Sequence, residues 1–140
     1  MTPQALTQYI RQDIRKVVHA DRIELYLPFY FRDTRQEPLR LIWDNRGVLS
    51  DGGRTIAELK KRVGDLTPYQ NSIQSILNAC GTVSLESGTK LVVRHFQDLI
   101  RGETVCKDYT GGLSRLLRVI SLISAVDTLT VSEDGTVWPC

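Results

Sequence analysis

The chain has 140 residues, of which 41% are hydrophobic and 24% are charged. A chain of this length fits one ordinary domain and buries enough apolar surface to fold without disulfides or a structural metal. The composition excludes disordered, collagen-like and membrane-embedded chains, because each of these classes needs a strong compositional bias. The formal net charge of +2 is too near balance to indicate a dedicated nucleic-acid binder. We expect a single globular domain over residues 1–140.

The cysteines Cys80, Cys106 and Cys140 are too far apart in sequence for a CxxC metal or redox motif. The first residues lead directly into a charged amphipathic segment, without the pattern of a secretory signal. No apolar run approaches the roughly 20 residues that span a bilayer. The sequence therefore predicts a cytoplasmic protein with no metal site, no cofactor and no membrane segment.

The N-terminal part of the chain predicts a helix followed by an antiparallel meander of three strands. Apolar side chains recur at helical spacing over residues 3–19. From Arg22 the period changes to two, and alternation resumes over residues 39–43 before the turn at residues 44–47 and a short strand at Val48–Leu49. The first strand has an apolar face of Ile23, Leu25, Leu27, Phe29 and Phe31 and an opposite face of Glu24, Tyr26, Pro28 and Tyr30, with the proline indicating a sheet edge.

Two helices are expected after the meander. Gly52–Gly53 end the meander, and Thr55–Glu58 has the spacing of a capping box, which predicts a helix over residues 56–63. Thr67–Gln70 repeats this spacing, with a proline at the first helical position. The second helix is expected to end at Gly81.

The rest of the chain predicts a hairpin over residues 83–93, a short helix over 96–100, an apolar helix that begins at Leu113 and a closing hairpin over 129–138. No internal repeat or linker separates these elements from the preceding ones. The fold class expected is α+β: a single domain in which an antiparallel β-meander packs on helices, with a small second hairpin.

Two segments of the sequence carry a resemblance to a known family. Ile23–Phe29 followed by Val48–Leu59 resembles a bacterial and phage family known as domain of unknown function 1828. In that family a strand leads to a Leu-(Ser/Thr)-Asp-(Asp/Gly)-Gly-x-Thr loop, which Leu49–Thr55 matches here. One departure is Leu27, which stands where a threonine is common.

The likeness continues downstream, where Ala79–Gly81 and Leu113–Val126 occupy the places of the family's Gly-ended helix and apolar helix. The resemblance covers about residues 5–126 and leaves a C-terminal hairpin over 127–140. The family implies no established activity, and it implies a genomic setting among prophages and mobile elements.

The loop Ser50–Thr55 is a candidate anion site. Its two glycines let the backbone approach a partner, and the following helix start offers N–H groups to a phosphate or carboxylate. The alternative is a tight strand-to-helix turn in which Asp51 bonds its own backbone. The helix that follows is the most basic element of the chain, so the candidate anion or nucleic-acid residues are Gly52, Gly53, Arg54, Lys60, Lys61 and Arg62.

A cysteine-dependent enzyme is one alternative that the residues leave open. His19 and His95 are the side chains suited to proton transfer at neutral pH. Cys80 or Cys106 would need such a base within hydrogen-bond reach to act as a nucleophile. His95 with Asp98 and Cys106 makes a Cys-His-Asp arrangement conceivable, although a half-buried structural cysteine is the commoner case.

Carboxylates offer a second enzyme or metal alternative. Asp44 and Asp51 flank a short strand, and Glu24 or Asp33 would have to complete a metal site. The same spacing is typical of turn residues. We therefore assign no catalytic residue and no metal ligand.

A protein-binding surface is the preferred interpretation. Tyr26, Tyr30 and Arg32 lie on or beside the strand face opposite Phe29, and exposed tyrosine next to arginine is typical of protein interfaces. The alternative is that a second helix covers this face and makes Tyr26 and Tyr30 part of the core. We expect a non-catalytic accessory or regulatory protein that docks on a host or phage protein. Its setting in a phage or mobile element, and a role as inhibitor of a host defence system, follow from the resemblance alone.

Two other functions remain as alternatives: a small nucleic-acid-binding regulator that uses the basic helix, and a cysteine- or carboxylate-dependent enzyme. The sequence makes no prediction of the oligomeric state.

Overall fold

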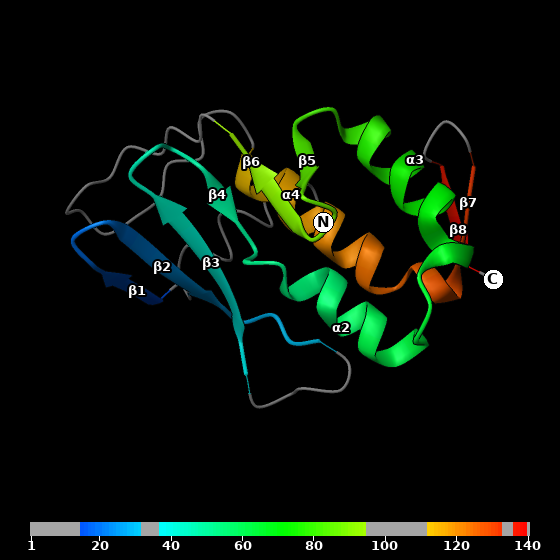
Figure 1. The fold of residues 1–140 in the computed structure, drawn as a ribbon, viewed down its shortest axis with the longest axis horizontal. Coiled ribbons are helices and arrows are strands. Elements are labelled where there is room, and N and C mark those ends of the chain that lie inside the picture. Colours follow the sequence, from blue (N-terminus) through cyan, green and yellow to red (C-terminus); the bar gives the residue numbers. More distant parts are fainter. Residues whose placement is uncertain (1–14, 32–36, 95–111, 133–135, 140) are drawn as a thin grey trace.

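The computed structural model describes residues 15–31, 37–94, 112–132 and 136–139, with positions 138 and 139 described through their backbone only. Six strands form one sheet in the order β1-β2-β3-β4-β6-β5, and every neighbouring pair is antiparallel (Figure 1). The strands are β1 (Arg15–Val18), β2 (Arg22–Leu27), β3 (Leu39–Asp44), β4 (Leu49–Ser50), β5 (Val83–Glu86) and β6 (Lys90–Val93).

The described helices pack against the part of this sheet formed by β5 and β6. They are α2 (Arg54–Val63), α3 (Gln70–Cys80) and α4 (Gly112–Ser124), with short 3-10 turns η1 (Thr67–Tyr69) and η2 (Val126–Thr128). Strands β7 (Leu129–Val131) and β8 (Val137–Pro139) form a separate ribbon beside α3. None of the helices in the described ranges is both long enough and apolar enough to cross a membrane.

The core lies between the sheet and α4, which packs against both α2 and α3 (Figure 1). Eight of the thirteen residues of α4 are buried, whereas Arg115, Arg118 and Ser121 are exposed, so the helix is amphipathic with a wide apolar face toward the core. Each leucine fully removed from water stabilises the fold by about 1.5–3 kcal/mol. The sheet contributes Leu25, Leu27, Leu39, Leu41, Leu49 and Leu91, all at most 1% exposed.

The structure confirms the α+β fold of one domain and the meander, which is formed by β2, β3 and β4. The hairpin expected over 83–93 also forms, as β5 and β6. It is not a separate ribbon, however, because Leu49 pairs with Val93 and so joins β6 to β4. The closing hairpin, β7 with β8, is the separate one. The apolar helix expected from Leu113 is α4.

The helix expected over residues 3–19 is wrong at its C-terminal end, where Arg15–Val18 forms β1. These residues pair with Tyr26 to Ile23 of β2, and the β-branched Val17 and Val18 favour an extended backbone. Strand β2 is consequently internal, and Pro28 lies just past its end rather than at a sheet edge. Residues 3–14 and the helix expected over 96–100 lie outside the described residues.

The capping box expected at Thr55–Glu58 does not form. Helix α2 begins at Arg54, its N-cap is Gly53, and no side chain of the cap residue bonds the helix. The Oγ1 atom of Thr55 is buried without a hydrogen-bond partner. The carboxylate of Asp51, four residues earlier, takes the capping role by accepting the Thr55 N–H at 3.2 Å.

Candidate functional site

The sheet face turned away from the helices, here called the outer face, carries a polar network. It is centred on Glu24 of β2, whose side chain points away from the core because Leu25 beside it points inward. The same alternation places Arg22 and Tyr26 on the outer face, and register pairing places Arg40 opposite Tyr26. We call Glu24 with His19, Arg22, Tyr26 and Arg40 the Glu24 network.

Glu24 is only 7% exposed, yet it has several partners. The Tyr26 hydroxyl donates to its Oε2 at 2.8 Å, and His19 Nε2 lies 3.5 Å from the same oxygen. Arg40 Nη1 and Arg22 Nη2 lie 3.5 and 3.6 Å from Oε1. One carboxylate therefore binds a tyrosine hydroxyl and forms ion pairs with two arginines at the surface.

The charge of Glu24 is stabilised by these neighbours. The hydrogen bond from Tyr26 is the largest influence, and with His19 and Arg40 it outweighs desolvation. The pKa of Glu24 is therefore lower than its ordinary value of 4.5. The carboxylate is ionised at neutral pH and keeps its attraction for the arginines.

The structure places the predicted tyrosines differently from each other. Tyr30 is 48% exposed, which fits the expected binding patch. Tyr26 is half-buried, its hydroxyl bonds Glu24, and the Arg15 guanidinium lies 4.4 Å from the centre of its ring. Arg32, the third residue of the predicted patch, lies outside the described residues.

The Gly52–Gly53 loop is a tight strand-to-helix turn. Both glycines have left-handed backbones, with φ of +68° and +85°, which other residues rarely adopt. Gly53 N–H donates to Asp51 Oδ1 at 2.9 Å, and Gly52 N–H donates to Ser50 Oγ at 3.4 Å. Arg54 N–H donates to the backbone oxygen of Asp51. The N–H groups that the anion hypothesis requires thus have acceptors inside the protein, which favours the turn interpretation.

Of the four basic residues of α2, the two lysines are exposed and the two arginines are bonded to other parts of the fold. Lys60 and Lys61 are exposed. The Arg54 side chain donates to the backbone oxygens of Pro38 and Glu37 at 2.9 and 3.2 Å.

Arg62 is also held inside the fold. Its Nη2 and Nε donate to the two carboxylate oxygens of Asp127 at 2.7 and 3.2 Å, and it also bonds the backbone oxygen of Ser124. Arg62 therefore ties α2 to the end of α4. Lys60 and Lys61 are the members of the predicted basic set that remain at the surface.

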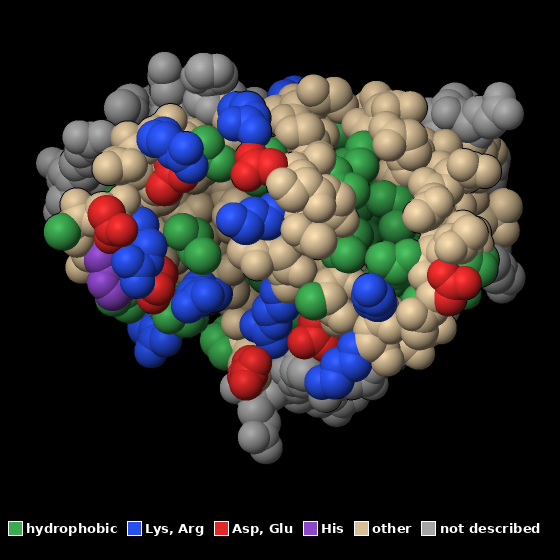
Figure 2. Space-filling view, viewed as in Figure 1, with side chains coloured by type: hydrophobic (Ala, Val, Ile, Leu, Met, Phe, Trp, Pro, Cys, Tyr) green, Lys and Arg blue, Asp and Glu red, His purple; other side chains and the backbone are tan. Residues whose placement is uncertain are grey.

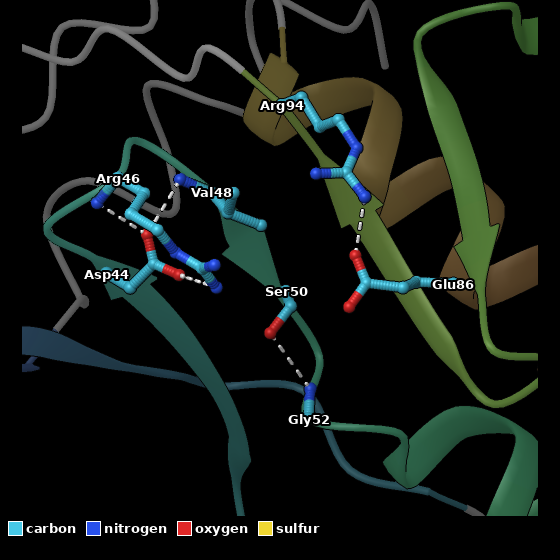
Figure 3. Close-up of polar contacts among 7 residues, drawn as sticks. All are labelled: Asp44, Arg46, Val48, Ser50, Gly52, Glu86 and Arg94. Carbon is cyan, nitrogen blue, oxygen red and sulfur yellow. Dashed lines mark hydrogen bonds and ion pairs between the residues drawn. The ribbon is translucent and has the colours of Figure 1, made fainter.

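Acidic partners are spread among the cations of the outer face. Figure 2 shows Lys and Arg side chains over this side of the molecule with Asp and Glu among them. Close up, Arg94 lies 2.6 Å from Glu86, and Arg46 lies 3.4 Å from Asp44, on the side of the sheet opposite α4 (Figure 3). Local pairing of this kind lowers the net charge that a distant polyanion would experience.

The residues of the enzyme and metal alternatives are not brought together by the described part of the chain. Cys80 is half-buried against the core, and His19 belongs to the Glu24 network. Across the described ranges, no group of three or more His, Cys, Asp or Glu side chains is placed to hold a metal ion. The other residues named for these alternatives, His95, Asp98, Cys106 and Asp33, lie outside the described residues.

Asp44 acts as a turn residue. Its Oδ1 accepts the N–H groups of Arg46 and Val48 at 2.8 and 3.1 Å (Figure 3). Burial raises the pKa of Asp44, but these two N–H groups and the Arg46 guanidinium outweigh it, so the pKa lies below its ordinary value of 3.8.

Sequence reasoning missed the Glu24 network. The alternation of Arg22, Glu24 and Tyr26 was a usable signal, because residues two apart on a strand share a face. The contribution of Arg40 was not readable, since it depends on the register between β2 and β3.

No family model matches the sequence, and neither a curated protein nor a solved structure matches it. The resemblance to domain of unknown function 1828 therefore stays a prediction.

Proposed function

We propose that the protein is a non-catalytic binding protein that docks on another protein through the outer face around Tyr26 and Tyr30. The observation that supports this most is the Glu24 network, which gathers Tyr26, Arg22 and Arg40 around one carboxylate at the surface. Tyrosine and arginine are among the side chains most enriched at interface hot spots. Side chains that are ordered before binding lose less conformational entropy when the complex forms.

We further propose that the partner is a host or phage protein and that the protein is an accessory or regulatory factor of a phage or mobile element. An inhibitor of a host defence system is the form of regulation that this setting favours. This part of the proposal rests on the resemblance of residues 23–29 and 48–59 to domain of unknown function 1828.

Affinity capture from a host lysate, followed by mass spectrometry, tests the proposal. The full chain is immobilised as wild type, as Tyr30→Ala and as Arg40→Ala, with Lys61→Ala on the opposite element α2 as a matched surface control. We expect one protein to be enriched by the wild type and the control and to be lost from Tyr30→Ala and Arg40→Ala. Equal capture by all four proteins would contradict this binding surface.

Nucleic-acid binding is the second candidate, because Lys60 and Lys61 are adjacent and exposed on α2. If it is correct, the double substitution Lys60→Glu, Lys61→Glu abolishes a gel shift of duplex DNA or RNA at about 50 mM salt, and the affinity of the wild type falls steeply as salt is added. The double substitution Arg46→Glu, Lys90→Glu, which makes the same change of charge on another surface, is the control. Absence of a shift at low salt would remove this candidate.

A further inference from the structure

Strand β1 forms one edge of the six-stranded sheet, and β2 is its only partner among the described strands. An edge strand offers backbone N–H and C=O groups to a further strand. Val17 and Val18 are 36% and 60% exposed, and Tyr30 is the only other large hydrophobic side chain that is exposed in the described part of the chain. Apolar exposure is therefore concentrated at the end of this edge.

An open pocket of about 280 Å³ begins where β1 ends. It lies between the turn at residues 19–21 and the end of β3. Its lining combines apolar residues with polar and charged ones of both signs: Val18, Ala20, Ile23 and Trp43, and His19, Asp21, Arg22, Asp44 and Asn45. The apolar part of this lining can take a single apolar side chain of a partner, which would be removed from water there, and the partner residue that enters the pocket is uncharged.

The positive charge of β1 indicates which kind of strand can pair with its free edge. Arg15 and Lys16 are its first two residues, and β1 contains no acidic residue. Pairing two copies of β1 would bring four cations onto two adjacent strands, and like charges across a strand pair are destabilising. An acidic strand would instead gain favourable cross-strand pairs.

We propose that β1 binds an extended segment of a partner protein as a seventh strand of the sheet. The segment carries acidic side chains opposite Arg15 and Lys16 and places one apolar side chain in the pocket beside Val18 and Trp43. In this mode of recognition the backbone hydrogen bonds supply affinity and the pocket supplies specificity. The four residues of β1 present an edge of about 13 Å, enough for a partner strand of about four residues.

This inference rests on the proposed protein-binding function and describes the form of the partner, but it uses a different surface from Tyr30. The edge adjoins the Glu24 network, because His19 and Arg22 line the pocket and Arg15 lies over the Tyr26 ring. Tyr30 belongs neither to β1 nor to the pocket, so its substitution tests the proposed function separately from the edge strand.

A displayed library of random peptides, selected against the immobilised full chain, tests the inference without a known partner. We expect the enriched sequences to carry two adjacent acidic residues, opposite Arg15 and Lys16, and an apolar residue two positions further along, opposite Val18. The best peptide is then synthesised with a fluorescent label, and its anisotropy is titrated with each variant. Val18→Asp and Lys16→Glu are each expected to weaken binding by about tenfold or more, the size of a hot-spot loss.

Lys61→Glu is the matched control, since it makes the same charge change as Lys16→Glu on exposed α2. It is expected to alter peptide affinity by about twofold or less, because a distant surface charge is screened. Thermal unfolding checks that Val18→Asp is folded, and Lys16→Glu provides a second variant if it is not. Bound peptide should also slow amide hydrogen exchange at residues 15–18.

Three results would overturn the inference: no enriched motif, a basic motif, or a peptide that binds the wild type, Val18→Asp and Lys16→Glu equally. Dimerisation of the chain through β1 would also overturn it, because a second copy of the chain would then occupy the edge. Competition for β1 by RNA would overturn it in the same way. If Tyr30-dependent capture from lysate persists in Val18→Asp while no peptide is selected, the edge-strand inference fails and the proposed function stands.

Discussion

Asp51 and Leu91 are paired like two residues of adjacent strands, although 40 positions separate them. The Asp51 N–H donates to the backbone oxygen of Leu91 at 3.2 Å, and the Leu91 N–H donates to Asp51 Oδ1 at 3.1 Å. The carboxylate takes the place of a backbone carbonyl. It also accepts the N–H groups of Gly53 and Thr55, so one buried side chain joins β6 to the start of α2.

Asp51→Ala is expected to lower the free energy of unfolding by about 3 kcal/mol, because three N–H groups lose their acceptor and two of these hydrogen bonds are buried. Asp51→Asn keeps one oxygen and should cost about 1 kcal/mol. Urea denaturation followed by circular dichroism measures both. Asp21→Ala, which removes an exposed aspartate, is the control and should change stability by about 0.5 kcal/mol or less. Equal stability of Asp51→Ala and the control would contradict this role.

Arg62→Lys is expected to destabilise the fold by about 1–2 kcal/mol, since an ammonium group cannot donate to both carboxylate oxygens of Asp127 as the guanidinium does. Lys61→Ala, on the exposed side of the same helix, should have an effect near zero. Chemical denaturation at equal protein concentration compares them. A loss of stability in Lys61→Ala equal to that in Arg62→Lys would show that the ion pair with Asp127 contributes little.

Tyr30→Ala is expected to weaken binding of the captured partner by about 1–3 kcal/mol, the range of interface hot spots. Its stability should change by about 1 kcal/mol or less, because nearly half of the side chain is exposed before binding. Calorimetric titration with the purified partner measures the first value, and thermal unfolding measures the second. Wild-type affinity in Tyr30→Ala would place the binding surface elsewhere.

Acid should destabilise the protein through Glu24 and Asp44. Both carboxyl groups have a pKa in the folded chain that is lower than their ordinary values of 4.5 and 3.8. Their contribution is fully present above those values and is lost as the pH falls through the lowered pKa of each group, because the unfolded chain then binds more protons.

The unfolding free energy, measured at several pH values from about 7 downwards, should therefore begin to fall below about pH 4.5. Glu24→Gln should reduce the steepness of this fall, since the amide that replaces the carboxylate does not take up a proton in this range. Asp21→Asn, which removes an exposed carboxyl group, is the comparison variant. An acid profile of Glu24→Gln identical to that of the wild type would show that Glu24 does not contribute to the pH dependence.

Local sequence patterns were sufficient for most of the fold. Alternation identified β2 and β3 and the face of each that is buried, because a strand with one face in the core must alternate. The predicted end of the second helix at Gly81 was confirmed, because Gly81 has a left-handed backbone and caps the end of α3. The pattern left open whether Tyr30 is exposed or part of the core, and the structure shows it exposed, three residues past the end of β2.

Tertiary structure alone decided the elements whose local pattern was ambiguous or whose partners are distant. The apolar side chains up to Val18 recur at helical spacing, but Arg15–Val18 pairs with β2 and forms a strand. Pairing of this kind leaves no periodic signal in the paired residues themselves.

Arg54, Arg62 and Asp51 read as surface or turn residues, yet each bonds a group 16 or more positions away. Hydrogen bonds between distant residues depend on the register and packing of whole elements. Composition and spacing therefore determine which segments form helices and strands, whereas the assembled sheet determines which charges are held inside the fold and which stay at the surface for a partner.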